Sequence, residues 1–287
     1  MELTFAARTD VGRERERNED NFLVDRKLRL FVVCDGMGGH VAGAVASAMA
    51  TAGIHDVVQQ SAALLVAYDE DPHSETRRRD ILSLLEHAVA RASSQIYERA
   101  TENPHERGMG TTATALLFAG GRAFIAHVGD SRCYLLRHGA IHQMTEDHSL
   151  LSDMLKSGRI KTVQEVDRRF RNAVTRGVGI HATVEVDTLD IAVLPEDRIL
   201  LCSDGLTGYA AARTLRQILT AETDETRACD NLVQFANDAG GNDNITAVLA
   251  TVRTTGLTDE SRVKQLFETF QAITLFRYLA FAEQARV

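Results

Sequence analysis

Three apolar segments of the sequence each run directly into an aspartate that stands beside a glycine. These segments are Val32-Val33-Cys34-Asp35-Gly36, Ala126-His127-Val128-Gly129-Asp130 and Leu200-Leu201-Cys202-Ser203-Asp204-Gly205. A fourth aspartate, Asp243, precedes the apolar segment that begins at Ile245, and Asn18-Glu19-Asp20-Asn21 adds two further acids. Short apolar runs are typical of buried strands, in which aspartate is disfavoured. The pattern therefore predicts carboxylates gathered at the ends of strands.

Carboxylates that end on one side of a sheet would repel one another unless a cation lies between them. A buried carboxylate without a partner is costly in free energy or loses its charge. Oxygen ligands beside glycines, whose backbone carbonyls can approach an ion, suit hard Mg²⁺ or Mn²⁺. A single Asp-Gly pair is more often a turn, but four such positions favour a multi-metal carboxylate site.

The rest of the chain alternates short apolar runs with longer helical ones. We expect strands at 28–34, 111–118, 122–128, 132–137, 184–192, 198–203 and 244–252, and helices at 40–60, 78–102, 213–220 and 225–239. The stretch 149–180 is polar and rich in arginine, which indicates a mobile excursion or a small subdomain. Many short strands, hairpin-length turns and singly inserted helices predict an α+β fold with antiparallel sheets.

Charge and composition exclude several classes of protein. Acidic residues outnumber basic ones by 40 to 32, a net charge of −8, so the basic surface of a nucleic-acid-binding protein is not expected. Residues 1–10 lack the apolar stretch of a signal peptide, and no unbroken apolar run approaches membrane-spanning length. The four cysteines show no CxxC spacing, and three of them lie inside apolar, strand-like runs that favour burial. We therefore expect a cytoplasmic protein with reduced, buried thiols and no membrane partner.

Two other enzyme classes share parts of this pattern. Gly36-Met37-Gly38-Gly39 begins like a dinucleotide-binding loop, but the third glycine of that loop would fall on Val41. A covalent phosphatase of the haloacid dehalogenase type also places an aspartate after an apolar strand. It needs a second aspartate two residues later, where this chain has Met37. That class is the runner-up among enzymes.

The ordered set of motifs resembles the protein phosphatase 2C family, the metal-dependent Ser/Thr phosphatases, in its bacterial form. The resemblance covers residues 4–252. It is carried by Thr9-Asp10-Val11-Gly12 with Arg15, Asn18-Glu19-Asp20, Asp35-Gly36-Met37-Gly38-Gly39-His40, Gly108-Met109-Gly110-Thr111-Thr112, Val128-Gly129-Asp130-Ser131-Arg132, Thr145-Glu146-Asp147-His148-Ser149, Cys202-Ser203-Asp204-Gly205-Leu206 and Gly241-Asn242-Asp243-Asn244-Ile245-Thr246. Each motif is weak alone, but their common order is specific.

The resemblance implies a sandwich of two antiparallel sheets flanked by helices, a four-layer αββα fold with metals at one end. The phosphatase domain would span residues 1–255, with a flap subdomain at about 149–180. Two or three Mn²⁺ or Mg²⁺ ions are implied. By position, Asp35 would bridge two of them, Asp204 and Asp243 would complete the first metal's shell, and Glu19 and the Gly36 carbonyl would serve the second.

Further roles follow from the same resemblance. Asp130 and Asp204 match the ligands of a third metal, with Asn172 as a further candidate. Arg15 matches the arginine that grips the substrate phosphate, and a guanidinium can hold two phosphate oxygens at once. Asp20 would orient metal-bound water. The general acid stays open between His40, a metal-bound water and solvent, and His40 could equally be a residue that packs locally at the start of a helix.

The implied activity is direct hydrolysis of phosphoserine or phosphothreonine by a metal-bound hydroxide, opposing bacterial Ser/Thr kinases. Phosphorylated proteins would be the substrates. One alternative is a catalytically silent binding protein that keeps only the phosphatase fold. Another is a narrower phosphatase that acts on a regulator of a sigma factor.

Residues 256–287 lie outside the resemblance, and their spacing predicts a helical C-terminal extension. The segment is very apolar, so it would either pack on the main domain or form a regulatory or dimer contact. Leu275-Phe276-Arg277-Tyr278-Leu279 followed by Glu283 is similar to the opening helices of cyclic-nucleotide-binding domains. The barrel that holds a nucleotide is missing, so nucleotide binding is not expected.

Overall fold

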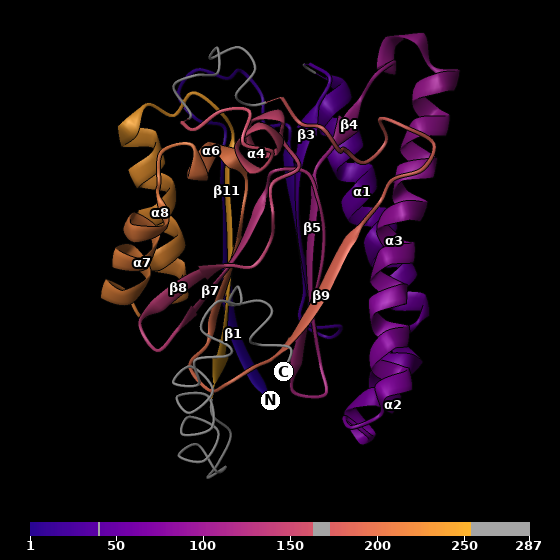
Figure 1. The fold of residues 1–287 in the computed structure, drawn as a ribbon, viewed down its shortest axis with the longest axis vertical. Helices are drawn as coiled ribbons and strands as arrows, with labels where there is room; N and C mark the ends of the chain where they lie inside the picture. Colours follow the sequence, from indigo (N-terminus) through magenta and orange to yellow (C-terminus); the bar gives the residue numbers. More distant parts are fainter. Residues whose placement is uncertain (40, 163–172, 254–287) are drawn as a thin grey trace.

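Two antiparallel sheets pack face to face, and helices cover both outer surfaces (Figure 1). The computed structural model describes residues 1–39, 41–162 and 173–253. The predicted α+β fold of four αββα layers is confirmed. His40, Asn172 and the predicted helical extension at 256–287 lie outside the described residues.

The first sheet has the strand order β1-β11-β10-β7-β8, and the second has β2-β3-β5-β6-β9 with β4 paired to β3. The strands of the first sheet are β1 (Glu2–Asp10), β7 (Arg132–Arg137), β8 (Ala140–Gln143), β10 (Arg198–Cys202) and β11 (Ile245–Arg253). Those of the second are β2 (Asp20–Asp25), β3 (Leu30–Met37), β4 (Gly110–Thr111), β5 (Ala113–Ala119), β6 (Arg122–Val128) and β9 (Asp187–Ala192).

The helices divide between the two outer faces. The second sheet is covered by α1 (Val41–Gln60), α2 (Ala62–Glu70) and α3 (Glu75–Glu102), and the first by α7 (Ala212–Ala221) and α8 (Glu225–Ala239). Shorter elements are η1 (Pro104–Glu106), α4 (Leu150–Lys156) and α6 (Asp204–Thr207). The helix α3 begins where the Ser74 side chain accepts a hydrogen bond from the Arg77 N–H, a regular N-cap.

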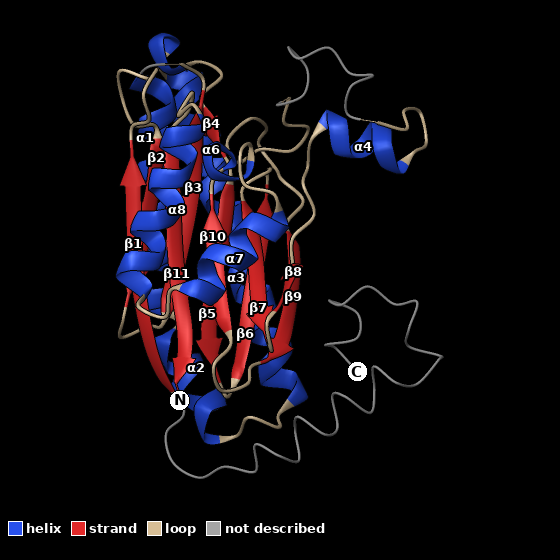
Figure 2. Cartoon of the chain, turned by 90° about the vertical axis from the view of Figure 1, so that its left-hand side faces the viewer, coloured by secondary structure: helices blue, strands red, loops and turns tan. Residues whose placement is uncertain are grey.

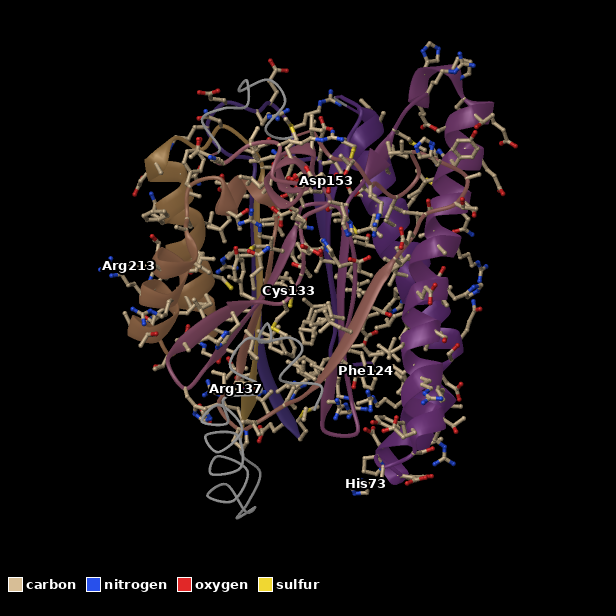
Figure 3. All side chains as sticks on the ribbon, viewed as in Figure 1. His73, Phe124, Cys133, Arg137, Asp153 and Arg213 are labelled. Carbon is tan, nitrogen blue, oxygen red and sulfur yellow. The ribbon has the colours of Figure 1, made fainter. Side chains whose placement is uncertain are left out.

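Three apolar cores separate the four layers. Phe124 belongs to the core between the second sheet and its helices, whereas Cys133 lies in the core between the two sheets (Figure 3). A third core joins the first sheet to α7 and α8. All four cysteines are free and buried, which confirms the prediction for the three in apolar, strand-like runs.

Helix α1 is, within the described ranges, the one helix long and apolar enough to cross a membrane by length and composition. Half of its apolar stretch is buried, and it packs against α3 and β3. A core helix of this kind passes the same test, so α1 is weak support for a membrane span.

Three strands were not predicted from the sequence: β1, β2 and β8, which are all edge strands of their sheets. Edge strands are half-buried and carry many polar residues, so they lack the continuous apolar run that marked the central strands. Helix α2 was also not predicted; it follows α1 after the single residue Ser61, with no glycine or proline to mark the break.

The segment between β8 and β9 leaves the sandwich. Its helix α4 stands away from both sheets (Figure 2). Residues 173–178 return toward the sheets, because Ser149 pairs with Val174 and Thr111 pairs with Val178 in isolated bridges. The described parts of the predicted flap thus lie beside the end of the sandwich where Asp35 and Asp130 are found.

Candidate metal centre

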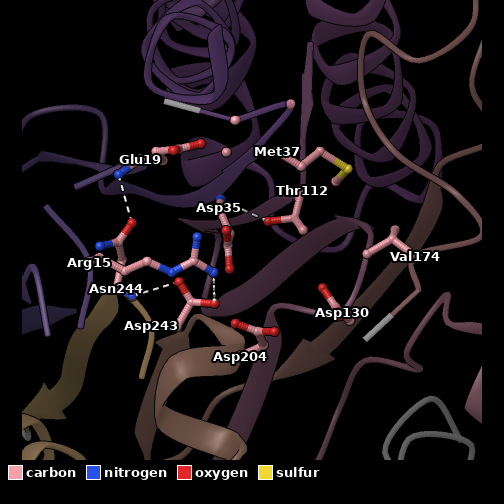
Figure 4. Close-up of a pocket in the computed structure, with 13 residues that line it drawn as sticks. Arg15, Glu19, Asp35, Met37, Thr112, Asp130, Val174, Asp204, Asp243 and Asn244 are labelled. Atoms are coloured by element: carbon pink, nitrogen blue, oxygen red, sulfur yellow. Dashed lines mark hydrogen bonds and ion pairs between the residues drawn. The ribbon is translucent and has the colours of Figure 1, made fainter. Parts of the chain in front are cut away.

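The predicted carboxylates gather at one end of the sandwich, in a cavity of about 290 Å³ (Figure 4). From the sequence we expected them on one side of a single sheet. In the structure they come from both sheets. Asp35 lies within β3 of the second sheet, Asp130 in the turn that crosses between the sheets, and Asp204 and Asp243 flank strands of the first sheet. Packing two sheets face to face brings their ends together, and this packing could not be predicted from the strands of one sheet alone.

Seven of the predicted site residues line this cavity: Arg15, Glu19, Asp35, Gly36, Asp130, Asp204 and Asp243. Asp20 is described but does not line it. Val174, from the returning part of the flap, forms part of the wall (Figure 4). The cavity therefore joins five acidic residues of the sandwich to the segment that returns from α4.

Asp20 lies beneath the cavity. Its carboxylate is buried, and Oδ2 accepts hydrogen bonds from the hydroxyls of Ser203 at 2.8 Å and Thr246 at 2.6 Å. The other oxygen, Oδ1, has no hydrogen-bond partner. Thr246 lies in β11 and Ser203 directly follows β10, both of the first sheet, whereas Asp20 begins β2 of the second. These hydrogen bonds therefore connect the two sheets under the site.

Burial and mutual repulsion raise the pKa of Asp20, Asp35, Asp130 and Asp204. Burial, with Asp204 and Asp147 close by, raises the pKa of Asp130 to about 7. Burial also raises the pKa of Asp20 to about 7 despite its two hydrogen bonds. The pKa of Asp35 is raised well above its usual range, first by burial and then by Asp20 and Asp204. Such a cluster favours a cation, which would hold every carboxyl in its charged form.

The donor chemistry of the cavity fits a divalent metal. Its ligand atoms are carboxylate and carbonyl oxygens, and buried Asp204 Oδ1 has no hydrogen-bond partner. Within the described residues, however, no three His, Cys, Asp or Glu side chains already converge on one point as an ion would require. The carboxylates share one cavity without forming a closed ligand shell.

Close backbone approaches explain why glycines flank the site. A Cβ atom on Gly36 would lie 2.3 Å from the Gly43 carbonyl oxygen, and one on Gly43 would lie 2.0 Å from Glu19 Oε2. The start of α1 can therefore press against β3 and the Glu19 carboxylate only because both residues lack a side chain. Gly36 and Gly43 therefore leave room for the Glu19 carboxylate and the start of α1, and they do not form a nucleotide-binding loop.

Comparison with known proteins agrees with this geometry. A profile of the family described as protein phosphatase 2C matches residues 13–245. The serine/threonine phosphatase stp of Listeria innocua is 37% identical over 245 residues, which are 84% of this chain and 93% of the relative. The crystal structure of the Mycobacterium tuberculosis serine/threonine phosphatase PstP/Ppp superposes with a TM-score of 0.76 at 35% identity, covering 88% of this chain and 99% of the other.

The chain belongs to the protein phosphatase 2C family. It is a Ser/Thr protein phosphatase, and its substrates are therefore phosphorylated proteins. A further solved structure, the catalytic domain of PstP in complex with two manganese ions, is 35% identical with a TM-score of 0.74, covering 88% of this chain and 99% of that one. The haloacid dehalogenase interpretation is excluded.

In this phosphatase, Arg15 is already paired with a predicted metal ligand. Its Nη2 donates to Asp243 Oδ2 at 2.7 Å (Figure 4). Its Nε donates to the Asn242 carbonyl at 3.3 Å. The side chain is half exposed at the cavity rim. Arg15 can meet an incoming phosphate from this place, although in this structure its charge faces Asp243.

Two positioning residues of the phosphatase site were not singled out from the sequence. The Asn244 side chain accepts from the Glu19 N–H at 2.8 Å and donates to the carbonyls of Val11 and Arg17 at 2.9 Å each. Thr112 Oγ1 accepts from the Asp35 N–H at 2.9 Å. Both stand in quoted motifs, where a small polar residue beside an apolar strand was the available signal.

Proposed function

We propose that this phosphatase uses two or three Mn²⁺ or Mg²⁺ ions to hydrolyse phosphoserine and phosphothreonine directly, without a protein nucleophile. The proposal rests on one observation, a cavity lined by five acidic residues and three glycines. The acids are Glu19, Asp35, Asp130, Asp204 and Asp243, and the glycines are Gly36, Gly38 and Gly39. The solved PstP relative with two manganese ions supports the choice of metal and a count of at least two.

The residues divide into holders of metal and holders of substrate. Asp35, central in the cavity, would bridge two ions, with Asp204 and Asp243 on one side and Glu19 and the Gly36 carbonyl on the other. Asp130 and Asp204 would hold a third. Bound there, divalent cations supply charge neutralisation for the phosphoryl group and lower the pKa of water.

The chain's own side chains would orient the reactants. Arg15, at the rim, would exchange its contact with Asp243 for two oxygens of the substrate phosphate, which fixes the phosphorus for in-line attack. Asp20, buried with one oxygen unpartnered, would act on water from beneath the site. The general acid stays open between His40, a water and solvent.

We further propose that the enzyme acts in the cytoplasm of a bacterial cell, where it opposes Ser/Thr kinases. Support comes from the bacterial relatives, which carry the name Ser/Thr phosphatase. The narrower substrate, a regulator of a sigma factor, and a regulatory or dimer contact by residues 256–287 stay open predictions.

Hydrolysis of a phosphothreonine peptide, followed by released phosphate, tests the proposal. We expect turnover when Mn²⁺ is in excess and no turnover after chelation with EDTA. Adding Mn²⁺ back should restore turnover. Turnover that persists in EDTA would contradict the metal role. No turnover under any condition, together with tight binding of the peptide, would favour the silent binding protein instead.

A further inference from the structure

His148 fastens the turn that presents Asp130 to the cavity. The His148 N–H donates to the Gly129 carbonyl at 2.7 Å, and its ring nitrogen Nδ1 accepts the Gly129 N–H at 3.1 Å. The N–H and the carbonyl of Gly129, the residue before Asp130, are therefore both hydrogen-bonded to His148, one to its ring and the other to its backbone. His148 is buried, with 7% of its surface exposed.

The turn itself has little freedom. Gly129 has φ of 111°, and a Cβ there would lie 2.5 Å from the Thr112 side chain. Thr112 Oγ1 also binds the Ser131 hydroxyl at 2.8 Å and the Asp35 N–H. The turn at 129–131 is thus wedged between His148 on one side and the threonine that holds Asp35 on the other.

The hydrogen bonds around the ring select one tautomer of His148. A backbone N–H can only donate, so Nδ1 must accept from Gly129, and the proton of the neutral ring is then on Nε2. Nε2 lies 3.1 Å from Asp187 Oδ2, which can accept that proton. Arg176 Nη1 also lies 3.1 Å from Nε2, but a guanidinium can only donate, so it makes no hydrogen bond to the protonated Nε2. Arg176 Nη1 donates to the other oxygen of Asp187 at 2.7 Å and keeps the carboxylate in place.

The same residue lies at the root of the flap. The Thr175 N–H donates to the His148 carbonyl at 2.8 Å, and the Leu150 N–H donates to the Ala173 carbonyl at 2.9 Å. The chain leaves for α4 directly after His148 and returns directly beside it. The intervening Val174 lines the cavity.

We propose that His148 is a positioning residue, held by Asp187 in the tautomer whose Nδ1 accepts from Gly129, and that it sets the place of Asp130 as a metal ligand. The inference rests on the proposed metal role of Asp130. It gives a function to the Thr145-Glu146-Asp147-His148-Ser149 motif, and it links the flap root to the metal centre through a single side chain.

A matched pair of substitutions isolates the acceptor at Nδ1. The amide oxygen of asparagine can take the place of Nδ1, whereas the amide of glutamine reaches the place of Nε2. His148→Gln therefore keeps a partner for Asp187 but loses the acceptor for Gly129, and His148→Asn does the reverse. Asp187→Asn leaves the ring in place and removes the carboxylate that fixes its tautomer.

Calorimetric titration of each full-length variant with Mn²⁺ alone provides the readout, and thermal unfolding checks that each is folded. Asp130→Asn identifies the binding step that depends on Asp130. We expect His148→Gln to weaken that step by about 10- to 100-fold, Asp187→Asn to weaken it less, and His148→Asn to restore most of it. Glu185→Gln, which removes only an exposed ion pair of Arg176, serves as the control and stays at the wild-type value.

The outcomes separate this inference from the proposed function. Wild-type-like binding by His148→Gln, or equal weakening in His148→Asn and His148→Gln, would overturn the role of Nδ1 while leaving the phosphatase mechanism intact. Absence of Mn²⁺ binding by the wild type, or an isotherm unchanged in Asp130→Asn, would overturn the metal role of Asp130 and this inference with it.

Discussion

Asp20 and Asp35 are directly opposed across strands β2 and β3, yet only Asp35 lines the cavity. Because side chains at paired positions point to the same face of a sheet, both carboxylates face the first sheet. Asp20 reaches Ser203 and Thr246 there, while Asp35 opens into the space between Asp204 and Asp130. One pair of strands thus supplies both a buried anchor and a cavity-lining acid to the same site.

Gly43 and Gly53 make a matched test within α1. Alanine favours helix over glycine by about 1 kcal/mol, but a Cβ at Gly43 would lie 2.0 Å from Glu19 Oε2, whereas at Gly53 its nearest neighbour is 3.3 Å away. We expect Gly43→Ala to lower Mn²⁺-dependent turnover by about tenfold or more, the range for disturbing the setting of a metal ligand. Gly53→Ala should keep wild-type turnover. Equal turnover in both variants, measured across a Mn²⁺ titration, would show that Glu19 is not constrained by α1.

Arg15 should act mainly on substrate binding. Arg15 would give up one charged hydrogen bond, to Asp243, and make two with phosphate, so its net contribution is that of one such bond, about 1.5–3 kcal/mol. We expect Arg15→Ala to raise the KM of a phosphopeptide by about 10- to 100-fold, and Arg15→Lys to fall between it and the wild type. Steady-state kinetics at saturating Mn²⁺ measure this. Arg13→Ala, which loses an exposed pair with Asp238 and a hydrogen bond to the Asn237 carbonyl but does not line the cavity, is the control. A KM unchanged in Arg15→Ala would place the phosphate elsewhere.

His127 should make the protein sensitive to acid. Burial, with His148 beside it, lowers its pKa to about 4, whereas an unfolded histidine titrates near 6.5. The unfolded state therefore binds one proton more between these pH values, and the free energy of unfolding falls as the pH drops from about 6.5 toward 4. His127→Asn should reduce the slope by up to about 1.4 kcal/mol per pH unit. Urea unfolding between pH 5 and 6.5 gives the slopes; parallel slopes would refute the assignment.

Arg137 and Asp197 form a buried ion pair at the end of the sandwich far from the cavity (Figure 3). Arg137 donates to Asp197 through Nε at 2.8 Å and Nη2 at 2.6 Å. Asp197→Asn leaves a buried guanidinium without its counter-charge, so we expect a loss of about 3–5 kcal/mol in the free energy of unfolding. Asp230→Asn, at an exposed pair with Arg8, should cost less than about 1 kcal/mol. Turnover by the folded fraction should not change in either variant, and a stability loss of similar size in both would contradict the role of burial.

The central strands and the acids that follow them could be predicted from the sequence, because an apolar run that meets an aspartate has few other interpretations. The edge strands could not, because β1, β2 and β8 are half-buried and read as polar segments. Contacts between distant residues could not be predicted either: Arg78 of α3 reaches the buried carboxylate of Asp190 and fastens α3 to β9.

Residue roles within the site were less accessible to sequence reasoning. The positions of Asp35, Asp204 and Asp243 followed from their motifs, but the pairing of Arg15 with Asp243 depends on how two distant loops meet. The burial of Asp20 beneath the cavity depends on the packing of one sheet on the other. Asn244 and His148 stand in motifs, but the backbone groups that they bind, at Glu19 and Gly129, are far away in the sequence and follow only from the fold.

The central claim is that Asp35 joins two metal ions into one reaction centre. Mn²⁺ binding to wild type and Asp35→Asn, measured by calorimetry beside phosphopeptide hydrolysis, tests it most directly. We expect the wild type to bind at least two equivalents and to hydrolyse the peptide, and Asp35→Asn to lose at least one equivalent together with nearly all turnover. If Asp35→Asn bound the same number of ions with the same affinity, or kept wild-type turnover, the account of the site would be wrong.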